Sequence, residues 1–237
     1  FPYTTLFRSG LLRMSHIEDL IREHCPEGVE TRALGEIGQL VRGNGMPKTD
    51  FTDSGVGAIH YGQIYTYYGT WTTTTISHVA PATATRLAKV DPGDLIITNT
   101  SENLDDVGKA VAWLGDAQIV TGGHATVLKH DQDPKFVAYW LQTADFYVQK
   151  KRLARGTKVI DVSATDLAKI RMPLPPLAVQ RAIVEVLDTF TELEAELEAE
   201  LEAELEAELE ARRRQYQYYR DSLLTFSQRE SPMGPVE

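Results

Sequence analysis

The chain has 237 residues, of which 42% are hydrophobic and 24% charged, and a formal net charge of -10; this length and apolar share suffice for one or two soluble domains with a core of their own. Collagen and disorder over the full length are not expected. A membrane channel is not expected either, because no window reaches the roughly 18 apolar residues of a spanning helix. No export signal opens the chain, so we expect a cytoplasmic protein with no membrane partner. The single cysteine, Cys25, rules out an internal disulfide and a thiol-bound zinc site.

The first residues differ in character from the rest of the chain. Residues 1–13 are expected to be a non-native or disordered leader, with Met14 as the plausible start. Ser15 and Glu18 form the pattern of a capping box, which predicts a short helix that ends before Pro26. Its apolar face consists of Ile17, Leu20 and Ile21.

Short runs rich in Gly, Thr, Val, Ile and Tyr extend from about Val29 to Thr126 and are broken by turn residues. This pattern predicts strands and loops. The predicted strands are residues 33–42, 58–64, 94–99, 108–114 and 124–130. They indicate a mixed sheet whose loops carry many hydrogen-bonding side chains.

A helix is predicted to begin at Pro134, which suits the first helical position. Apolar residues then recur every three or four positions, so one stripe of a single helix should pack on the sheet. The stripe consists of Phe136, Val137, Trp140, Leu141, Ala144 and Val148. Residues 14–172 are therefore expected to form one α/β (α+β) domain.

A proline-rich joint comes after this domain. Pro173, Pro175 and Pro176 cannot continue a helix interior, so we expect a stiff hinge, with a PxxP ligand as the alternative. Residues 177–226 lack Gly and Pro altogether. They predict one helix of roughly 75 Å at 1.5 Å per residue. The domain division is thus 14–172, then 173–226 for hinge and helix, and a disordered tail over 227–237.

The long helix contains an internal LEAE repeat with its leucines four residues apart. Each leucine advances by about 40° around the helix, so five of them form no straight coiled-coil seam. We interpret the repeat as a spacer between two packing ends, with an isolated charged helix as the alternative. The candidate packing residues are Ile183, Val186, Leu187 and Phe190 before it, and Tyr216, Tyr219, Leu223 and Phe226 after it.

The negative charge is concentrated in this helix. Twelve of the 34 acidic residues lie between Glu185 and Ala211, where Lys and Arg are absent, which leaves 22 acidic against 24 basic residues elsewhere. The remainder of the chain is therefore free to contact phosphate.

Motifs of catalysis are missing from the sequence. No phosphate-binding loop, HExxH, GxSxG or adenine-methyltransferase motif occurs, and the paired glycines at 43–45 and 55–57 are interpreted as turns. His124 follows Gly122 and Gly123 and could point into a groove, although a buried core histidine is the favoured interpretation. We expect a non-catalytic protein with no metal site and no cofactor of its own.

Cations at the end of the predicted aromatic helix indicate phosphate binding, with a solvated helix end as the alternative. Cations fix position on a duplex, whereas Asn, Gln and similar side chains read base edges, so the inventory suits a reader of double-stranded DNA. The candidate DNA-binding residues are Lys48, Tyr61, Gln63, Tyr65, Asn99, Ser101, Asn103, Lys109, Lys150, Lys151, Arg152, Arg155 and Lys158.

From about Val29 to Phe226 the layout resembles one half of the specificity subunit of type I restriction-modification systems. The matching stretches are LGEIGQLVRGNGMP, PGDLIITNTSENLDDVGKAV and ARGTKVIDVSATDLAKIRMPLPPLAVQRAIVEVLDTF, and after them the acidic repeats and RRRQYQYYRDSLLTF. The order of these motifs and the joint Leu174-Pro175-Pro176-Leu177, with Gln180 and Ile183 after it, match together.

The resemblance implies a target-recognition domain for a short DNA half-site and a helix that spaces it from a second unit and docks methyltransferase subunits. Family members carry two such halves whose helices pack antiparallel in a coiled coil. This chain has one half, so it is either a fragment or a natural half that pairs with a copy of itself. Adenine methylation would use S-adenosylmethionine on the modification subunits, and cleavage would use ATP and Mg²⁺ on the restriction subunits.

Two rival interpretations stay open. The first is an acidic interaction protein or DNA mimic that acts through the Glu-rich helix, and the second is a restriction or modification enzyme with its own active site. The identity of the target bases depends on loop geometry that the sequence does not specify.

Overall fold

The computed structural model describes residues 15–225, so the predicted leader at 1–13 and tail at 227–237 lie outside the described residues. The chain divides into two compact units between Val186 and Leu187. The boundary expected after residue 172 therefore falls inside the first unit, which also contains the hinge and the first turns of the long helix.

The first unit contains a five-stranded sheet. Its strands, in spatial order, are β2 (Gly38–Arg42), β12 (Ala125–His130), β8 (Leu95–Thr98), β10 (Ala110–Trp113) and β5 (Trp71–Thr72). The first four pair antiparallel, whereas β5 runs parallel to β10. The predicted mixed sheet is confirmed.

A second five-stranded sheet lies in the same unit. Its order is β3 (Phe51–Thr52), β6 (Ser77–Val79), β4 (Val56–Ile59), β11 (Ile119–Thr121) and β7 (Ala88–Val90), with β4 parallel to β11. Two short ribbons pair β1 (Thr31–Ala33) with β14 (Arg171–Pro173), and β9 (Thr100–Ser101) with β13 (Ile160–Asp161).

Short helices connect these strands. They are a helix over residues 15–24, α2 (Leu34–Ile37), the 3-10 turn η1 (Lys48–Asp50), α3 (Tyr61–Thr66), α4 (Pro81–Ala84), α5 (Pro134–Trp140), α6 (Ala144–Leu153) and α7 (Ala164–Leu167). The long helix α8 (Leu177–Leu224) begins in the first unit and continues in the second.

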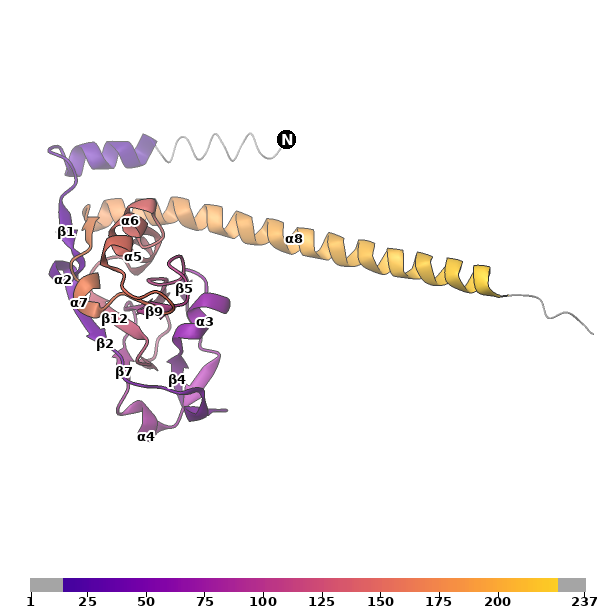
Figure 1. Ribbon diagram of the computed structural model, residues 1–237. Coiled ribbons are helices and arrows are strands. Elements are labelled where there is room, and N and C mark those ends of the chain that lie inside the picture. Colours follow the sequence, from indigo (N-terminus) through magenta and orange to yellow (C-terminus); the bar gives the residue numbers. More distant parts are fainter. Residues whose placement is uncertain (1–14, 226–237) are drawn as a thin grey trace, which may run out of the picture. The chain divides into compact units, whose positions relative to one another are not determined.

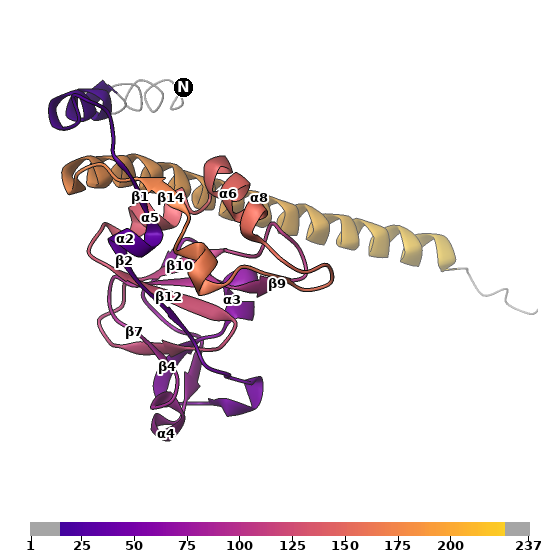
Figure 2. The same cartoon turned by 60° about the vertical axis from the view of Figure 1, so that its left-hand side comes forward.

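Alternation along the strands explains the layers of the first unit. In β8, Leu95 and Ile97 face the cluster that contains the α5, α6 and α7 side chains, whereas Ile96 faces the second sheet. In β11, Ile119 faces the first sheet and the next residue, Val120, packs with α4. Figures 1 and 2 show α5 and α6 at one end of this unit and α4 at the other. Every residue of β8 is buried because layers cover both its faces.

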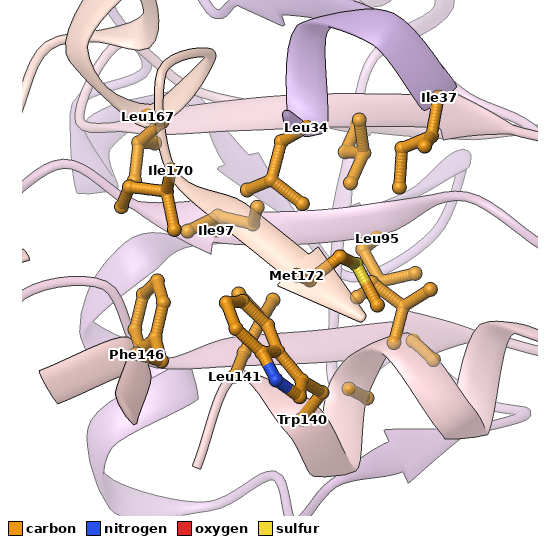
Figure 3. Packing of buried hydrophobic residues seen from close by; sticks show 14 of the residues in the cluster. Leu34, Ile37, Leu95, Ile97, Trp140, Leu141, Phe146, Leu167, Ile170 and Met172 are labelled. Carbon is orange, nitrogen blue, oxygen red and sulfur yellow. The ribbon is translucent and has the colours of Figure 1, made fainter. Parts of the chain in front are cut away.

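The largest cluster joins the helices to the first sheet, as Figure 3 shows. Trp140 and Phe146 meet edge to face with ring centroids 5.8 Å apart, and both pack in the cluster that contains Leu95 and Ile97. Val184 of α8 belongs to the same cluster. The first turns of the long helix are thus part of the domain core.

Two predicted strands are wrong in part. Residues 33–42 contain the end of β1, then α2, then β2, and residues 58–64 contain the end of β4 and most of α3. Helix α3 begins where it does because His60 Nδ1 accepts from Gly62 N at 3.1 Å and Gln63 Oε1 accepts from His60 N at 2.9 Å. This reciprocal cap turns the chain out of the sheet.

The single helix predicted from Pro134 is wrong as well. Thr143 accepts a hydrogen bond from Phe146 N and starts α6 as a separate helix after α5. The change of direction leaves Ala144 and Val148 of the predicted stripe exposed and buries Phe146 and Lys150 instead.

The second unit contains the remainder of α8, and most of its leucines in the described chain are exposed. The exposed fractions of Leu197, Leu201, Leu205 and Leu209 lie between 51% and 61%. Of the predicted packing residues, Ile183 and Val186 pack within the first unit and Leu187 is half-buried, whereas Phe190, Tyr216, Tyr219 and Leu223 are exposed and Phe226 lies outside the described residues. Across residues 15–225, no helix combines the length and apolar character that crossing a bilayer requires.

Candidate nucleic-acid interface

A group of rings gathers around the start of α3; we call Phe51, His60, Tyr61, Tyr65 and His124 the ring cluster. The ring centroids of Tyr61 lie 4.8 Å from His124, 4.4 Å from His60 and 6.1 Å from Tyr65. Phe51 meets His60 edge to face at 5.8 Å. The cluster joins the second sheet, α3 and the loop that leads into β12, so it presents flat faces from three parts of the fold.

His124 is the exposed imidazole of this cluster. Its Nδ1 lies 2.9 Å from Thr100 Oγ1, which fixes the ring from the side of β9. Because Nδ1 is engaged and the residue is exposed, Nε2 is the ring nitrogen left for an external hydrogen bond. The interpretation of His124 as a buried core histidine is wrong.

Glycines allow the loop of His124 to lie where it does. A Cβ on Gly43 would lie 2.0 Å from Gly122 O, and a Cβ on Gly122 would lie 2.7 Å from Met46 Cβ. A bridge between Asn44 and Gly122 holds the two loops backbone to backbone. Gly43 and Gly122 therefore allow the close approach of the two backbones.

Cations gather around the ribbon of β9 and β13, where Thr100 pairs with Asp161. Arg155 exchanges two backbone hydrogen bonds with Asp161, and Arg42 Nη2 lies 3.6 Å from Asp161 Oδ2. Between Arg155 and Asp161 the chain turns at Gly156, whose φ is 99°. This turn carries the exposed Lys158.

We give the name reading surface to the exposed and half-buried side chains around this ribbon and the ring cluster. It consists of Arg42, Arg155, Lys158, Ser101, Tyr61 and His124. Its parts are connected, because His124 bonds Thr100, Thr100 pairs with Asp161, and Asp161 contacts Arg42 and Arg155. The surface combines exposed cations with an oriented imidazole and a half-buried aromatic ring. Such a set can bind phosphate and contact bases or sugars at the same time.

Asn99, predicted to bind DNA, is fully buried instead. Its Nδ2 donates to Val162 O at 2.7 Å, and its Oδ1 accepts from Thr126 Oγ1 at 2.8 Å. Because both ends of the amide are hydrogen-bonded, one to β12 and the other to the segment after β13, it cannot also reach a base. This prediction is corrected: Asn99 supports the strand from which Thr100 and Ser101 extend.

Gln63 and Tyr65 are engaged within the fold as well. Gln63 uses Oε1 in the cap of α3, and its Nε2 donates to Ser77 Oγ at 2.6 Å. The hydroxyl of Tyr65 donates to Thr100 O at 2.6 Å, and burial raises the pKa of this tyrosine. Both side chains hold α3 and β9 in place around the ring cluster, and their predicted role in reading bases stays untested.

Lys150, predicted to contact phosphate, is only 4% exposed. Its Nζ donates to Asp105 O at 3.1 Å and to Val107 O at 2.7 Å, and burial lowers its pKa. The ammonium therefore closes the turn after β9 rather than facing solvent, which corrects the prediction. The five cations expected to form one cluster divide into this buried group, Lys151 and Arg152 on α6, and Arg155 and Lys158 beside β13.

The same turn holds two further predicted residues. Asn103 Oδ1 accepts from Asp106 N at 2.8 Å and its Nδ2 donates to Asp106 Oδ2 at 2.7 Å, while Lys109 Nζ pairs with Asp106 Oδ1 at 2.6 Å. Asn103 and Lys109 are exposed but engaged with the turn. Lys48 is exposed on η1, close enough to His60 that its charge, after burial, lowers the pKa of that histidine.

The sequence interpretation missed Arg42 and favoured a buried position over a groove position for His124. Arg42 ends a strand in a stretch with no cation cluster, so nothing local marked it, whereas the Gly-Gly-His loop before β12 was a usable signal. Among residues 15–225 no group of three or more His, Cys, Asp or Glu side chains is arranged to hold a metal ion.

The chain is similar to known proteins. The family model for the type I restriction modification DNA specificity domain matches residues 26–207. A putative type I restriction enzyme specificity subunit of Haemophilus influenzae is 38% identical over 120 residues, which cover 48% of this chain and 30% of that protein. A putative type I specificity subunit of Mycoplasma pneumoniae is 47% identical over 107 residues, which cover 43% of this chain and 30% of that protein.

A solved structure from work on complex assembly and conformational transition of a type I R-M system has the same fold. Its chain matches with a TM-score of 0.54 at 20% identity, covering 88% of this chain and 53% of that chain. The matches thus span 30% of each of the two relatives named above and about half of this solved chain. The match of the family model to most of the chain confirms the resemblance seen in the sequence: the chain belongs to the type I restriction modification DNA specificity domain family.

Proposed function

We propose that this chain is a non-catalytic subunit that binds one half-site of a specific double-stranded DNA sequence and directs partner subunits to it. The observation that carries the proposal is the reading surface, where His124 is oriented by Thr100 beside the exposed Arg42, Arg155 and Lys158. Arg and Lys contribute salt-dependent phosphate contacts, which position a protein on the duplex. The imidazole and Ser101 supply hydrogen bonds for base edges.

The partners derive from the family and belong to this proposal. Methyltransferase subunits would bring S-adenosylmethionine for adenine methylation, and restriction subunits would bring ATP and Mg²⁺ for cleavage. Both relatives named above are described as specificity subunits, which supports a role in target choice for this chain.

Selection from a randomised pool of duplexes tests the DNA half of the proposal. The full chain should enrich one short motif, and His124→Ala should relax one position of that motif while binding persists. His24→Ala is the matched control, because His24 is an exposed histidine on the helix over residues 15–24. Failure of the native chain, with its methyltransferase subunits present, to prefer any motif would overturn the proposal.

We further propose that α8 pairs antiparallel with a second half or a second copy of this chain. If Ile183 lies opposite Leu223 of the second helix, the same register places Leu197 opposite Leu209 and Leu201 opposite Leu205. These four leucines are more than half exposed, and such pairing would cover part of that surface.

A further inference from the structure

A glutamine lies fully buried at the start of α8. The exposed fraction of Gln180 is 0%, although an amide buried without partners is costly. Its Oε1 accepts from Asp133 N at 3.0 Å, and its Nε2 donates to Gln132 Oε1 at 2.9 Å and to Pro175 O at 2.7 Å. One side chain therefore connects the proline joint, the loop before α5 and the long helix, all within the first unit.

The partner of Gln180 is itself the cap of another helix. Asp133 Oδ1 accepts from Phe136 N at 3.0 Å and so fixes the first turn of α5, while its backbone N–H is taken by Gln180. The first turns of α8 are thus hydrogen-bonded to the first turn of α5 through a single residue. Val179, Val184 and Val186 of α8 are buried as well, and their side chains are apolar.

Apolar and amide contacts constrain a helix differently. Hydrophobic burial is non-directional, so valines alone permit a helix to rotate or slide by a fraction of a turn. A buried amide with three bonds of defined geometry permits one register, because a shift of one residue moves the helix by about 1.5 Å and turns it by about 100°. Register is therefore set by Gln180 more than by these valines.

We infer that Gln180 is a positioning residue that holds the start of α8 in one register on the rest of the first unit. It thereby restricts the subunit to DNA sites with one number of base pairs in the gap between the two half-sites. This inference rests on the proposed function, since the gap has meaning only if two half-sites are read. Gln180 acts through the helix and not through contact with DNA.

The test compares Gln180→Leu with Arg181→Ala, a change at the exposed neighbouring residue. Spin labels on Asp116→Cys and Glu194→Cys, in the full chain with Cys25→Ser, report the distribution of distances across the joint by pulsed electron resonance. The distribution should at least double in width for Gln180→Leu and stay unchanged for Arg181→Ala. Equal widths in both variants would overturn the inference.

A second readout is the gap itself. With the methyltransferase subunits of its system, Gln180→Leu should methylate sites whose gap is one base pair longer or shorter at least tenfold more than the native chain does, while binding to a single half-site duplex stays within about twofold. A broadened distance distribution with unchanged gap selection would also overturn the inference. Absence of half-site preference in the native chain would instead overturn the proposed function. If Gln180→Leu does not fold, Gln132→Ala removes one of the three bonds and should shift both readouts in the same direction; no shift would count against the inference.

Discussion

Lys150 is the residue whose structural position departs furthest from its predicted role. Lys150→Met keeps the length of the side chain but leaves Asp105 O and Val107 O without their donor. An unsatisfied buried acceptor costs about 1–3 kcal/mol, so the free energy of unfolding should fall by that order. Urea unfolding of Lys150→Met beside Lys151→Met, the exposed neighbour, measures it; equal stability of the two variants would contradict the buried role.

The exposed cations of the reading surface are expected to contribute to DNA binding. Arg155→Ala together with Lys158→Ala should weaken binding to all duplexes and reduce the slope of log K against log salt by roughly one for each phosphate that the variant no longer neutralises. Arg22→Ala, an exposed cation on the helix over residues 15–24, should leave the slope unchanged. Salt titrations of affinity decide between these outcomes, and a slope unaffected by the double change would show that Arg155 and Lys158 do not bind phosphate.

His60 links stability to pH. Burial first, then the charges of Lys48 and His124, lower the pKa of His60, and its Nδ1 must stay unprotonated to accept from Gly62 N. The unfolded chain therefore binds more protons, so stability falls as pH falls through about 6.5, by at most about 1.4 kcal/mol per pH unit for this group. His60→Asn keeps a capping acceptor and should flatten this fall in stability between pH 7.5 and 5.5 in urea unfolding. His130, whose pKa burial also lowers, leaves a residual slope; a slope identical to the native chain's would contradict the assignment.

These residues show what the sequence can reveal of a site. Side-chain type indicates which groups can bind DNA, and Arg155 and Lys158 are exposed cations as predicted. Residue type does not show where a side chain points or whether it is already hydrogen-bonded within the fold. Asn99 and Lys150 are suited to DNA binding by their chemistry, but both are hydrogen-bonded inside the fold. His124 was misjudged for the same reason, since its exposure depends on backbone packing of the 43–45 and 122–123 segments.

At the scale of elements, long or strongly patterned segments were predictable and short ones were not. Strands β8, β10 and β12 and helix α8 lie within their predicted ranges because each has a sustained apolar run or a long stretch without helix breakers. Helices α2 and α3, at four and six residues, are too short to show periodicity. They depend on caps and on tertiary contacts that a single sequence does not display.

The repeat in α8 predicts a change of spacing. Deleting one LEAE, residues 201–204, shortens the helix by about 6 Å, or between one and two base pairs at 3.4 Å each. The gap between methylated half-sites should shorten while the half-site sequences stay the same. Sequencing of methylated DNA measures both, with Glu202→Gln and Glu204→Gln as a control that removes charge at constant length. A deletion that leaves the gap as it was would refute the spacer role.

At the scale of the whole molecule, the two units differ in the charges that they carry. The acidic residues of the repeat lie on the part of α8 that belongs to the second unit, whereas the reading surface lies in the first unit and is cationic. An acidic interaction protein would need carboxylates to dominate the folded surface. The proposed function needs only that the first unit carries exposed cations of its own, which Arg42, Arg155 and Lys158 supply.

The proposed antiparallel pairing of α8 can be tested, because the charge of this helix changes from negative to positive along its length. Its acidic repeat ends at Glu210, and Arg212, Arg214 and Arg220 come after it, two of which pair with Glu208 and Glu210 one turn earlier. In the antiparallel register with Ile183 opposite Leu223, Arg212 and Arg214 lie opposite Glu194 and Glu192 of the second helix, while residues 196–210 face the same acidic stretch of that helix. A parallel pairing in register would keep the contact between acidic stretches and lose both Arg–Glu pairs. Like charges set opposite each other disfavour a partner and opposite charges favour it.

Replacing Arg212, Arg214 and Arg220 by Glu should therefore weaken self-association at least tenfold at low salt, and adding Glu192→Lys and Glu194→Lys to the same chain should restore it in part. Sedimentation equilibrium at two salt concentrations measures both. Reversal without effect on association, or failure of the compensating changes while the helix content is retained, would show that the helices do not pair antiparallel in this register.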